Sequence, residues 1–252
     1  MSKTILITGA SSGFGEATAK ALAKEGHRLI LCARRKERLE TLAASLDTDT
    51  HVLAFDVQDR NAITTALESL PAEWLQIDVL INNAGLALNT APADQCPLED
   101  WDTMIATNIQ GLVTLTRYCL PAMRARGVGH VVNVSSMAGN YAYPGSNVYG
   151  ASKAFVSYFS QALRSDLHGS GVRVTNIEPG LAETEFSNVR FKGDDARADS
   201  VYDGVQPLVG DDVAETIRWA IAQPPHVNIN RIELMPTCQS LAGPMVYRGD
   251  AA

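Results

Sequence analysis

A glycine-rich turn between a short apolar run and an alanine-rich stretch is the feature that most constrains how this chain can fold. Residues 3–8 are mostly apolar, residues 9–15 read Gly-Ala-Ser-Ser-Gly-Phe-Gly, and residues 16–25 have the composition of a helix. Glycine permits a sharp turn and lets an anion approach the first N–H groups of a helix, where the helix dipole favours negative charge. This order predicts a strand, a phosphate-binding turn and a helix, although a merely flexible turn has the same composition.

Apolar runs alternate with helical stretches along most of the chain. Alternation of this kind predicts an α/β protein, namely a single doubly wound Rossmann domain over residues 1–252 with a seven-stranded, mainly parallel sheet flanked by helices. We expect strands at 3–8, 28–33, 51–55, 77–81, 131–134 and 172–177, with a last strand before the tail at 234–246, and helices at 16–25, at 98–123, from Tyr149 to Leu167 and from about Asp211.

The overall charge and the cysteines exclude several classes of partner. The net charge is −7 and the pI is about 5.2, with no long basic run, which argues against nucleic acid and membrane surfaces. The four cysteines show neither a CxxC pair nor metal-ligand spacing. We therefore expect no metal site and the reduced thiols of a cytoplasmic protein. The first residues also lack the pattern of a signal peptide.

Two arginines follow the second expected strand, where dinucleotide-binding folds read the adenosine ribose. An acidic residue at this place would bind the ribose 2′-hydroxyl, whereas arginine accommodates a 2′-phosphate. This chain has Ala33 followed by Arg34 and Arg35, which favours NADP over NAD as the cofactor. Alternatively, the two arginines only begin the charged helix that follows.

Residues 135–153 hold a hydroxyl, a phenol and an amine in a spacing that suits proton transfer. Tyr149 and Lys153 are four residues apart, so they share one face of a helix that starts near residues 146–147. The charge of Lys153 would then lower the pKa of Tyr149 toward neutrality and make the phenol a general acid or base. Ser136 follows a buried strand, so the three groups could converge on one carbonyl oxygen. An ordinary surface Tyr/Lys pair has the same spacing.

Six motifs stand in a fixed order along essentially the whole chain. They are Thr8-Gly9-x-x-x-Gly13-x-Gly15, Asn82-Asn83-Ala84-Gly85, Asn108, Ser136, Tyr149-x-x-x-Lys153 and Pro179-Gly180. Their order and spacing resemble those of the short-chain dehydrogenase/reductase superfamily. Through residues 82–88, 147–155, 178–195 and 235–240, the chain looks most like NADP-dependent 3-hydroxy acid dehydrogenases. That group includes malonic semialdehyde reductase, L-allo-threonine dehydrogenase and serine 3-dehydrogenase, and sulfoacetaldehyde reductases share much of its pattern.

The resemblance implies a role for each motif residue. Tyr149 would exchange a proton with the substrate, Ser136 would hold the substrate oxygen, and Lys153 would lower the pKa of Tyr149 and bind the nicotinamide ribose. Asn108 would hold a water in a proton relay, unless it is an ordinary helix-kinking asparagine. Asp56 could equally be a helix N-cap. The implied cofactor-binding residues are Gly9, Ser11, Ser12, Gly13, Phe14, Gly15, Arg34, Arg35, Asp56, Val57, Asn83, Ala84, Gly85, Tyr149, Lys153, Pro179, Gly180 and Thr184.

The resemblance also implies a homotetramer, with dimers built from the helices around 101–123 and 147–167. The segment 234–246 after the last strand is apolar enough that exposure to water would be costly. We therefore expect an oligomerisation tail at about 235–252. The alternative is a tail that folds on its own subunit.

A segment rich in Gly and Asp between the sixth strand and the last helix suggests a mobile lid over the site, at about 181–209. If this segment is extended, Arg190 and Lys192 point the same way and clamp a substrate carboxylate. Alternatively, both cations only balance the neighbouring acidic residues.

These features predict an NADP-dependent oxidoreductase that interconverts a small 3-hydroxy acid and its 3-oxo acid, with Tyr149 as the acid/base. Alternatives are a sulfoacetaldehyde reductase, since a sulfonate would satisfy the same clamp, or a broad carbonyl reductase. A reading from a different class is a catalytically silent NADP-binding sensor or assembly protein. The intact Ser136, Tyr149 and Lys153 argue against that class.

Overall fold

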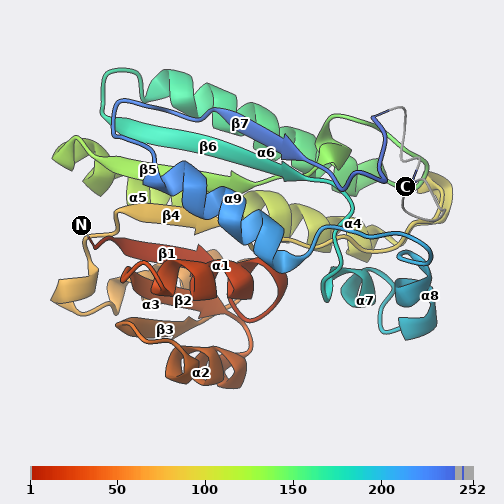
Figure 1. Ribbon diagram of the computed structural model, residues 1–252, viewed down its shortest axis with the longest axis horizontal. Coiled ribbons are helices and arrows are strands. Elements are labelled where there is room, and N and C mark those ends of the chain that lie inside the picture. Colours follow the sequence, from red (N-terminus) through yellow and green to blue (C-terminus); the bar gives the residue numbers. More distant parts are fainter. Residues whose placement is uncertain (1, 242–245, 247–252) are drawn as a thin grey trace.

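Seven strands form the central sheet of the protein in a computed structural model that describes residues 2–241 and residue 246 (Figure 1). All neighbouring strands are parallel, in the order β3-β2-β1-β4-β5-β6-β7, which confirms the predicted doubly wound sheet. The chain winds outward from β1 in both directions, so a crevice opens between β1 and β4 at their carboxyl ends. The strands are β1 (Thr4–Thr8), β2 (Arg28–Ala33), β3 (Thr50–Ala54), β4 (Val79–Asn82), β5 (Gly129–Val134), β6 (Val172–Pro179) and β7 (Arg231–Leu234).

Helices cover both faces of the sheet, and each face has its own apolar core. Leu22 and Ile217 pack on one face, and Leu115 and Leu163 on the other, all of them buried. Full burial of a side chain of this size stabilises the fold by roughly 1.5 to 3 kcal/mol. The first face carries α1 (Gly13–Ala23), α2 (Lys36–Ser45) and α9 (Gly210–Ala222), and the second carries α3 (Arg60–Glu68), α5 (Leu112–Arg126) and α6 (Asn147–Asp166) (Figure 1).

The helix expected over 98–123 is present, but its middle is not α-helical. It consists of α4 (Leu98–Ile105), a π-helical turn η3 (Ala106–Gly111) and α5. Gly111 lies against the backbone, since a Cβ there would come within 2.7 Å of the Val57 carbonyl oxygen. The π-turn also places the side chain of Asn108 inside the protein, where it is buried. Three single turns, η1 (Ala72–Trp74), η2 (Ala93–Gln95) and η4 (Met137–Gly139), complete the helical elements outside the segment 181–209.

Asp59, rather than Asp56, caps the helix after β3. The Asp59 carboxylate accepts hydrogen bonds from the N–H groups of Asn61 (2.8 Å) and Ala62 (3.0 Å) at the start of α3. Asp56 instead accepts one from the N–H of Gln58 (3.0 Å) in the preceding turn. The N-cap alternative for Asp56 is therefore wrong, and its side chain lies beside the crevice.

The segment 181–209 is helical where we expected extended chain. It contains α7 (Phe186–Arg190) and α8 (Asp195–Ser200). The N–H of Phe191 donates to the Ser187 carbonyl (3.0 Å), and Lys192 then turns the chain with a φ of 55°. The expectation that Arg190 and Lys192 point the same way is therefore wrong, because it required an extended strand.

The chain after β7 folds back on its own sheet for as far as it is described. The N–H of Leu181 donates to the side-chain oxygen of Gln239 (2.7 Å), and a Cβ on Gly180 would lie 2.8 Å from Met235 Cγ. The described part of the predicted oligomerisation tail thus contacts its own subunit, and residues 242–245 and 247–252 lie outside the described residues. Within the described ranges, every helix is too short or too polar to cross a membrane.

Candidate functional site

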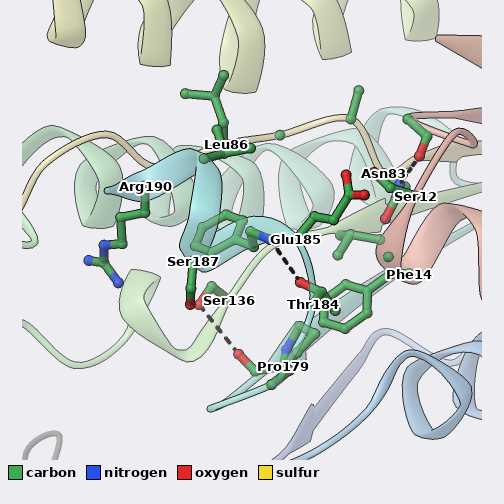
Figure 2. Close-up of a pocket in the computed structure, with 18 of the residues that line it drawn as sticks. Ser12, Phe14, Asn83, Leu86, Ser136, Pro179, Thr184, Glu185, Ser187 and Arg190 are labelled. Atoms are coloured by element: carbon green, nitrogen blue, oxygen red, sulfur yellow. Dashed lines mark hydrogen bonds between the residues drawn. The ribbon is translucent and has the colours of Figure 1, made fainter. Parts of the chain in front are cut away.

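A cavity of about 580 Å³ lies in the crevice at the carboxyl ends of the strands, between the glycine turn and the segment 181–209. It brings together residues from β2, β5, β6, α1, α6 and α7 and from the loops that follow β1 and β4 (Figure 2). Of the predicted site residues, the lining includes Gly9, Ser11, Ser12, Gly13, Phe14, Arg34, Arg35, Asp56, Val57, Asn83, Ala84, Gly85, Ser136, Tyr149, Lys153, Pro179, Gly180, Thr184 and Arg190. Gly15, Asn108 and Lys192 are outside it.

The backbone of the glycine turn leaves no room for side chains at Gly9 and Gly15. Gly9 has a φ of +66°, in the left-handed region that favours glycine. A Cβ on Gly15 would lie 2.3 Å from the Gly9 carbonyl oxygen and 2.6 Å from the Asn83 side-chain nitrogen. Gly15 therefore acts from behind the lining, by letting the first turn of α1 come close to the strands. The result is an open cradle at a helix N-terminus, which fits a pyrophosphate.

Three arginines lie near the end of the cavity where the sequence predicts that the adenosine ribose binds. The guanidinium of Arg35 donates to Ser12 Oγ (2.8 Å) in the glycine turn and pairs with Glu185 (3.0 Å). Arg34 lies 3.8 Å from Asp56, with most of its side chain exposed. Arg38 also pairs with Glu185, at 2.6 Å. Sequence reasoning missed Arg38, although it stands one helical turn after Arg34 on the first turn of α2.

Tyr149 and Ser136 lie within hydrogen-bonding reach of each other in the lining of the cavity. Ser136 Oγ donates to the Pro179 carbonyl (3.3 Å) and accepts a bond from the Ala138 N–H (3.1 Å) (Figure 2). Burial, followed by the neighbouring Tyr143, raises the pKa of Tyr149 to about 12, while hydrogen bonding with Ser136 lowers it by less. The phenol therefore keeps its proton at neutral pH.

Lys153 is buried behind Tyr149, where burial lowers the pKa of its amine to about 8. Its Nζ donates to the Val134 carbonyl (3.0 Å) and lies 5.9 Å from the centre of the Tyr149 ring. The expected lowering of the Tyr149 pKa by Lys153 is wrong for this structure. The reason is that burial of the phenol outweighs other influences, and the ammonium is aimed at the end of β5.

Asn108 connects three parts of the site from behind. Its side-chain oxygen accepts a bond from the Leu86 N–H (2.9 Å), and its nitrogen donates to the Leu86 carbonyl (2.8 Å) and to Ser152 Oγ (2.9 Å). These bonds hold the loop after β4 against α6. They support a structural role for the side chain, and its role in a proton relay stays a prediction.

Arg190 and Lys192 have different surroundings. Arg190 lines the cavity, donates to the Tyr143 hydroxyl (3.0 Å), and has its guanidinium carbon 5.7 Å from the centre of the Tyr149 ring. Its buried Nε has no hydrogen-bond partner in the described part of the chain. Lys192 pairs with the buried Asp100 (2.8 Å) away from the cavity. The prediction that two cations clamp a substrate carboxylate is therefore wrong for Lys192, which does not line the cavity.

Several aromatic and apolar lining residues escaped the sequence analysis. The ring of Phe186 lies 5.7 Å from that of Tyr149, and Tyr143, Tyr202 and Val246 also face the cavity. Nothing in their spacing marks them, because they come from separate parts of the chain, Phe186 from the start of α7 and the others from outside the helices and strands. Gln239 also lines the cavity, and it belongs to the tail segment that carried part of the resemblance.

Comparison with known proteins decides the family. Residues 3–195 match the short chain dehydrogenase family over most of the chain. The chain belongs to this family.

Similar dehydrogenases cover almost its full length. The serine 3-dehydrogenase of Rhizobium radiobacter is 56% identical to this dehydrogenase over 98% of the chain and 99% of that protein. The NADP-dependent 3-hydroxy acid dehydrogenase YdfG of Escherichia coli (strain K12) is 52% identical, over 97% and 99%. A closed form of serine dehydrogenase complexed with NADP+ superposes with a TM-score of 0.94 at 51% identity, covering 98% of this chain and 100% of that one.

The buried amine of this dehydrogenase predicts a pH-dependent stability change. Lys153→Met should raise the free energy of unfolding near pH 7 by about 2 to 3 kcal/mol, because burial moves the amine pKa from 10.5 to about 8. Between those pH values the folded lysine is neutral while the unfolded one still binds a proton. Wild-type stability therefore rises with pH across this window, and the advantage of the variant shrinks.

Urea unfolding of both proteins at pH 7 and pH 10 measures this difference. Lys24→Met, at an exposed lysine, serves as the control and should change stability little at either pH. An advantage of Lys153→Met that is equal at the two pH values would contradict the assignment.

Proposed function

We propose that this protein is an NADP-dependent oxidoreductase that interconverts a small 3-hydroxy acid and its 3-oxo acid. The observation that carries the proposal is the guanidinium of Arg190 over the ring of Tyr149, a cation beside the residue that would exchange the proton. The names of the similar serine 3-dehydrogenase and 3-hydroxy acid dehydrogenase support the same substrate class.

The residues present fit the cofactor at both ends of the cavity. The glycine cradle would hold the pyrophosphate, with Arg34 and Arg35 at the 2′-phosphate of the adenosine ribose. Residues 83–85 would border the adenosine, and Lys153 together with Pro179 the nicotinamide side. When bound, NADP supplies the hydride that is exchanged with the substrate carbon.

Residues of the protein itself would supply the proton that the substrate carbonyl oxygen takes up. A phenol whose pKa is about 12 is protonated at neutral pH, so Tyr149 is ready to donate to a carbonyl oxygen in the reductive direction. Ser136 would hold that oxygen, since its hydroxyl can turn from the Pro179 carbonyl. Arg190 stabilises negative charge nearby, and its charge also acts to lower the pKa of Tyr149.

The acid/base role of Tyr149 predicts the effect of removing its hydroxyl. Tyr149→Phe should lower kcat for NADPH-coupled reduction by about 10²- to 10⁴-fold, the usual worth of a positioned general acid. Tyr158→Phe, at an exposed position on the same helix, should leave kcat near wild type. If Tyr149→Phe kept NADPH-coupled turnover near the wild-type rate, the acid/base mechanism proposed here would be wrong.

The cofactor preference predicts a second effect. Replacing Arg34 and Arg35 together by Ala should weaken NADPH binding by about 2 to 4 kcal/mol and barely affect NADH, because charge-assisted bonds to a 2′-phosphate are lost. Fluorescence titration with each reduced cofactor measures both. Equal losses for the two cofactors would show that the arginines do not read the phosphate.

Arg190 predicts selectivity for anionic substrates. Arg190→Ala should lower kcat/KM for malonic semialdehyde by roughly 10- to 100-fold, as expected for a lost hydrogen bond to a charged group, and leave a neutral aldehyde of similar size nearly unchanged. Lys192→Ala is the matched control, because that ammonium pairs with Asp100 outside the cavity. Sulfoacetaldehyde tests whether a sulfonate is accepted equally. A wild type that reduces the neutral aldehyde as well as the anions would be a general carbonyl reductase.

We also propose a cytoplasmic homotetramer. Its support is an apolar surface on two helices that pack together, with Leu98 and Ile105 on α4 and Phe155 and Tyr158 on α6 all exposed. Light scattering at micromolar concentration should give about four times the chain mass of 27.1 kDa. A monomer under those conditions would rule the tetramer out.

A further inference from the structure

Glu185 connects the segment 181–209 with the arginines at the predicted adenosine end of the cavity. One carboxylate oxygen pairs with Arg35 (3.0 Å) and the other with Arg38 (2.6 Å). Arg35 at the same time donates to the serine hydroxyls of the glycine turn, at 3.2 Å to Ser11 and 2.8 Å to Ser12. Figure 2 shows Glu185 together with Ser12 and Asn83, with Arg190 at the opposite side of the view. A single carboxylate thus occupies two guanidinium groups, one of which also donates to two serine hydroxyls.

This arrangement has the chemistry of a phosphate site already filled by an anion. Guanidinium groups bind carboxylates and phosphates through the same paired N–H donors, and serine hydroxyls can donate to a phosphate oxygen. Burial tends to raise the pKa of Glu185, but the hydrogen bonds from Arg38 and Arg35 outweigh it and hold that pKa below its usual value. The carboxylate is therefore charged at neutral pH.

The pairs contribute little to stability, which leaves room for another role. The side chains of Glu185, Arg35 and Arg38 are 45%, 42% and 50% exposed. Ion pairs this exposed usually contribute little to the stability of a fold. Loss of the Glu185 charge should therefore leave the protein folded.

We propose that Glu185 competes with the 2′-phosphate of NADP(H) for Arg35 and Arg38, and thereby sets how strongly the enzyme favours NADP(H) over NAD(H). The inference rests on the proposed NADP dependence and adds a residue from a distant part of the chain to the cofactor's specificity site. If Glu185 leaves when the phosphate binds, two ion pairs are broken. If it stays, it repels the phosphate. In both cases the carboxylate weakens the binding of a 2′-phosphate and not of a 2′-hydroxyl.

Binding of two nucleotides that differ only in the 2′-phosphate tests this without turnover. The probes are adenosine 2′,5′-bisphosphate and 5′-AMP, titrated calorimetrically at low ionic strength into wild type, Glu185→Gln and Glu183→Gln. Glu183→Gln is the matched control, because it removes the same charge two residues away at an exposed position. We expect Glu185→Gln to bind the bisphosphate about three- to tenfold more tightly, with 5′-AMP unchanged and the control like wild type.

The other possible results distinguish a failure of the Glu185 proposal from a failure of the proposed NADP dependence. Unchanged or weaker bisphosphate binding in Glu185→Gln, with wild type still preferring the bisphosphate, would overturn the competition and leave the NADP proposal standing. Equal weakening of both nucleotides would mean that Glu185 only fastens the segment 181–209 over the cavity. A wild type with no preference for the bisphosphate would overturn both proposals. Tightening in Glu183→Gln as large as in Glu185→Gln would reduce the effect to net charge.

Discussion

The close approach of the glycine turn to the ends of β1 and β4 is the constraint on which the rest of the site depends. Asn83 donates from its side chain to the Thr8 carbonyl (2.9 Å), and Thr8 Oγ1 accepts bonds from the N–H groups of Asn83 and Ala84 (3.0 Å each). A side chain on Gly9 or Gly15 would collide with this junction. Because the junction is closed by backbone, helix α1 starts at the crevice and its N–H groups face the cavity.

At its other end, the same crevice buries two ionisable side chains, which is unfavourable for their charged forms. Lys153 is buried with a lowered pKa, and the phenol of Tyr149 is buried with a raised one, so both groups are held in a medium that disfavours their charged forms. A polar layer behind them fixes α6 in register. Ser135 Oγ donates to the Lys153 carbonyl (2.7 Å), and Ser157 Oγ donates to the buried Glu178 (2.9 Å). These bonds hold Tyr149 and Lys153 in place although burial disfavours their charged forms.

The fold, and the meeting of Ser136, Tyr149 and Lys153 in one cavity, could be predicted because local patterns determine them. Strand, glycine turn and helix are contiguous in the chain, and the spacing of Tyr149 and Lys153 places them on one helix face. The π-turn at Asn108 could not be predicted, since it depends on bonds to Leu86 and to Ser152 in α6, far along the chain. The predicted direction of the Lys192 side chain was wrong for the same reason, because a short helix and an ion pair with the buried Asp100 determine it. The predicted lowering of the Tyr149 pKa was wrong because the burial of the phenol, which raises that pKa, depends on the tertiary structure.

Helix α7 connects two groups of residues that line or border the cavity. It has only five residues, yet Glu185 immediately precedes it and pairs with two arginines at the start of α2, while Arg190 ends it over Tyr149. The contacts of Glu185 and Arg190 are therefore made from the two ends of one short helix, whose backbone hydrogen bonds fix the spacing between them. The place of Glu185 beside the arginines and the place of Arg190 beside Tyr149 are thus not independent features of the fold.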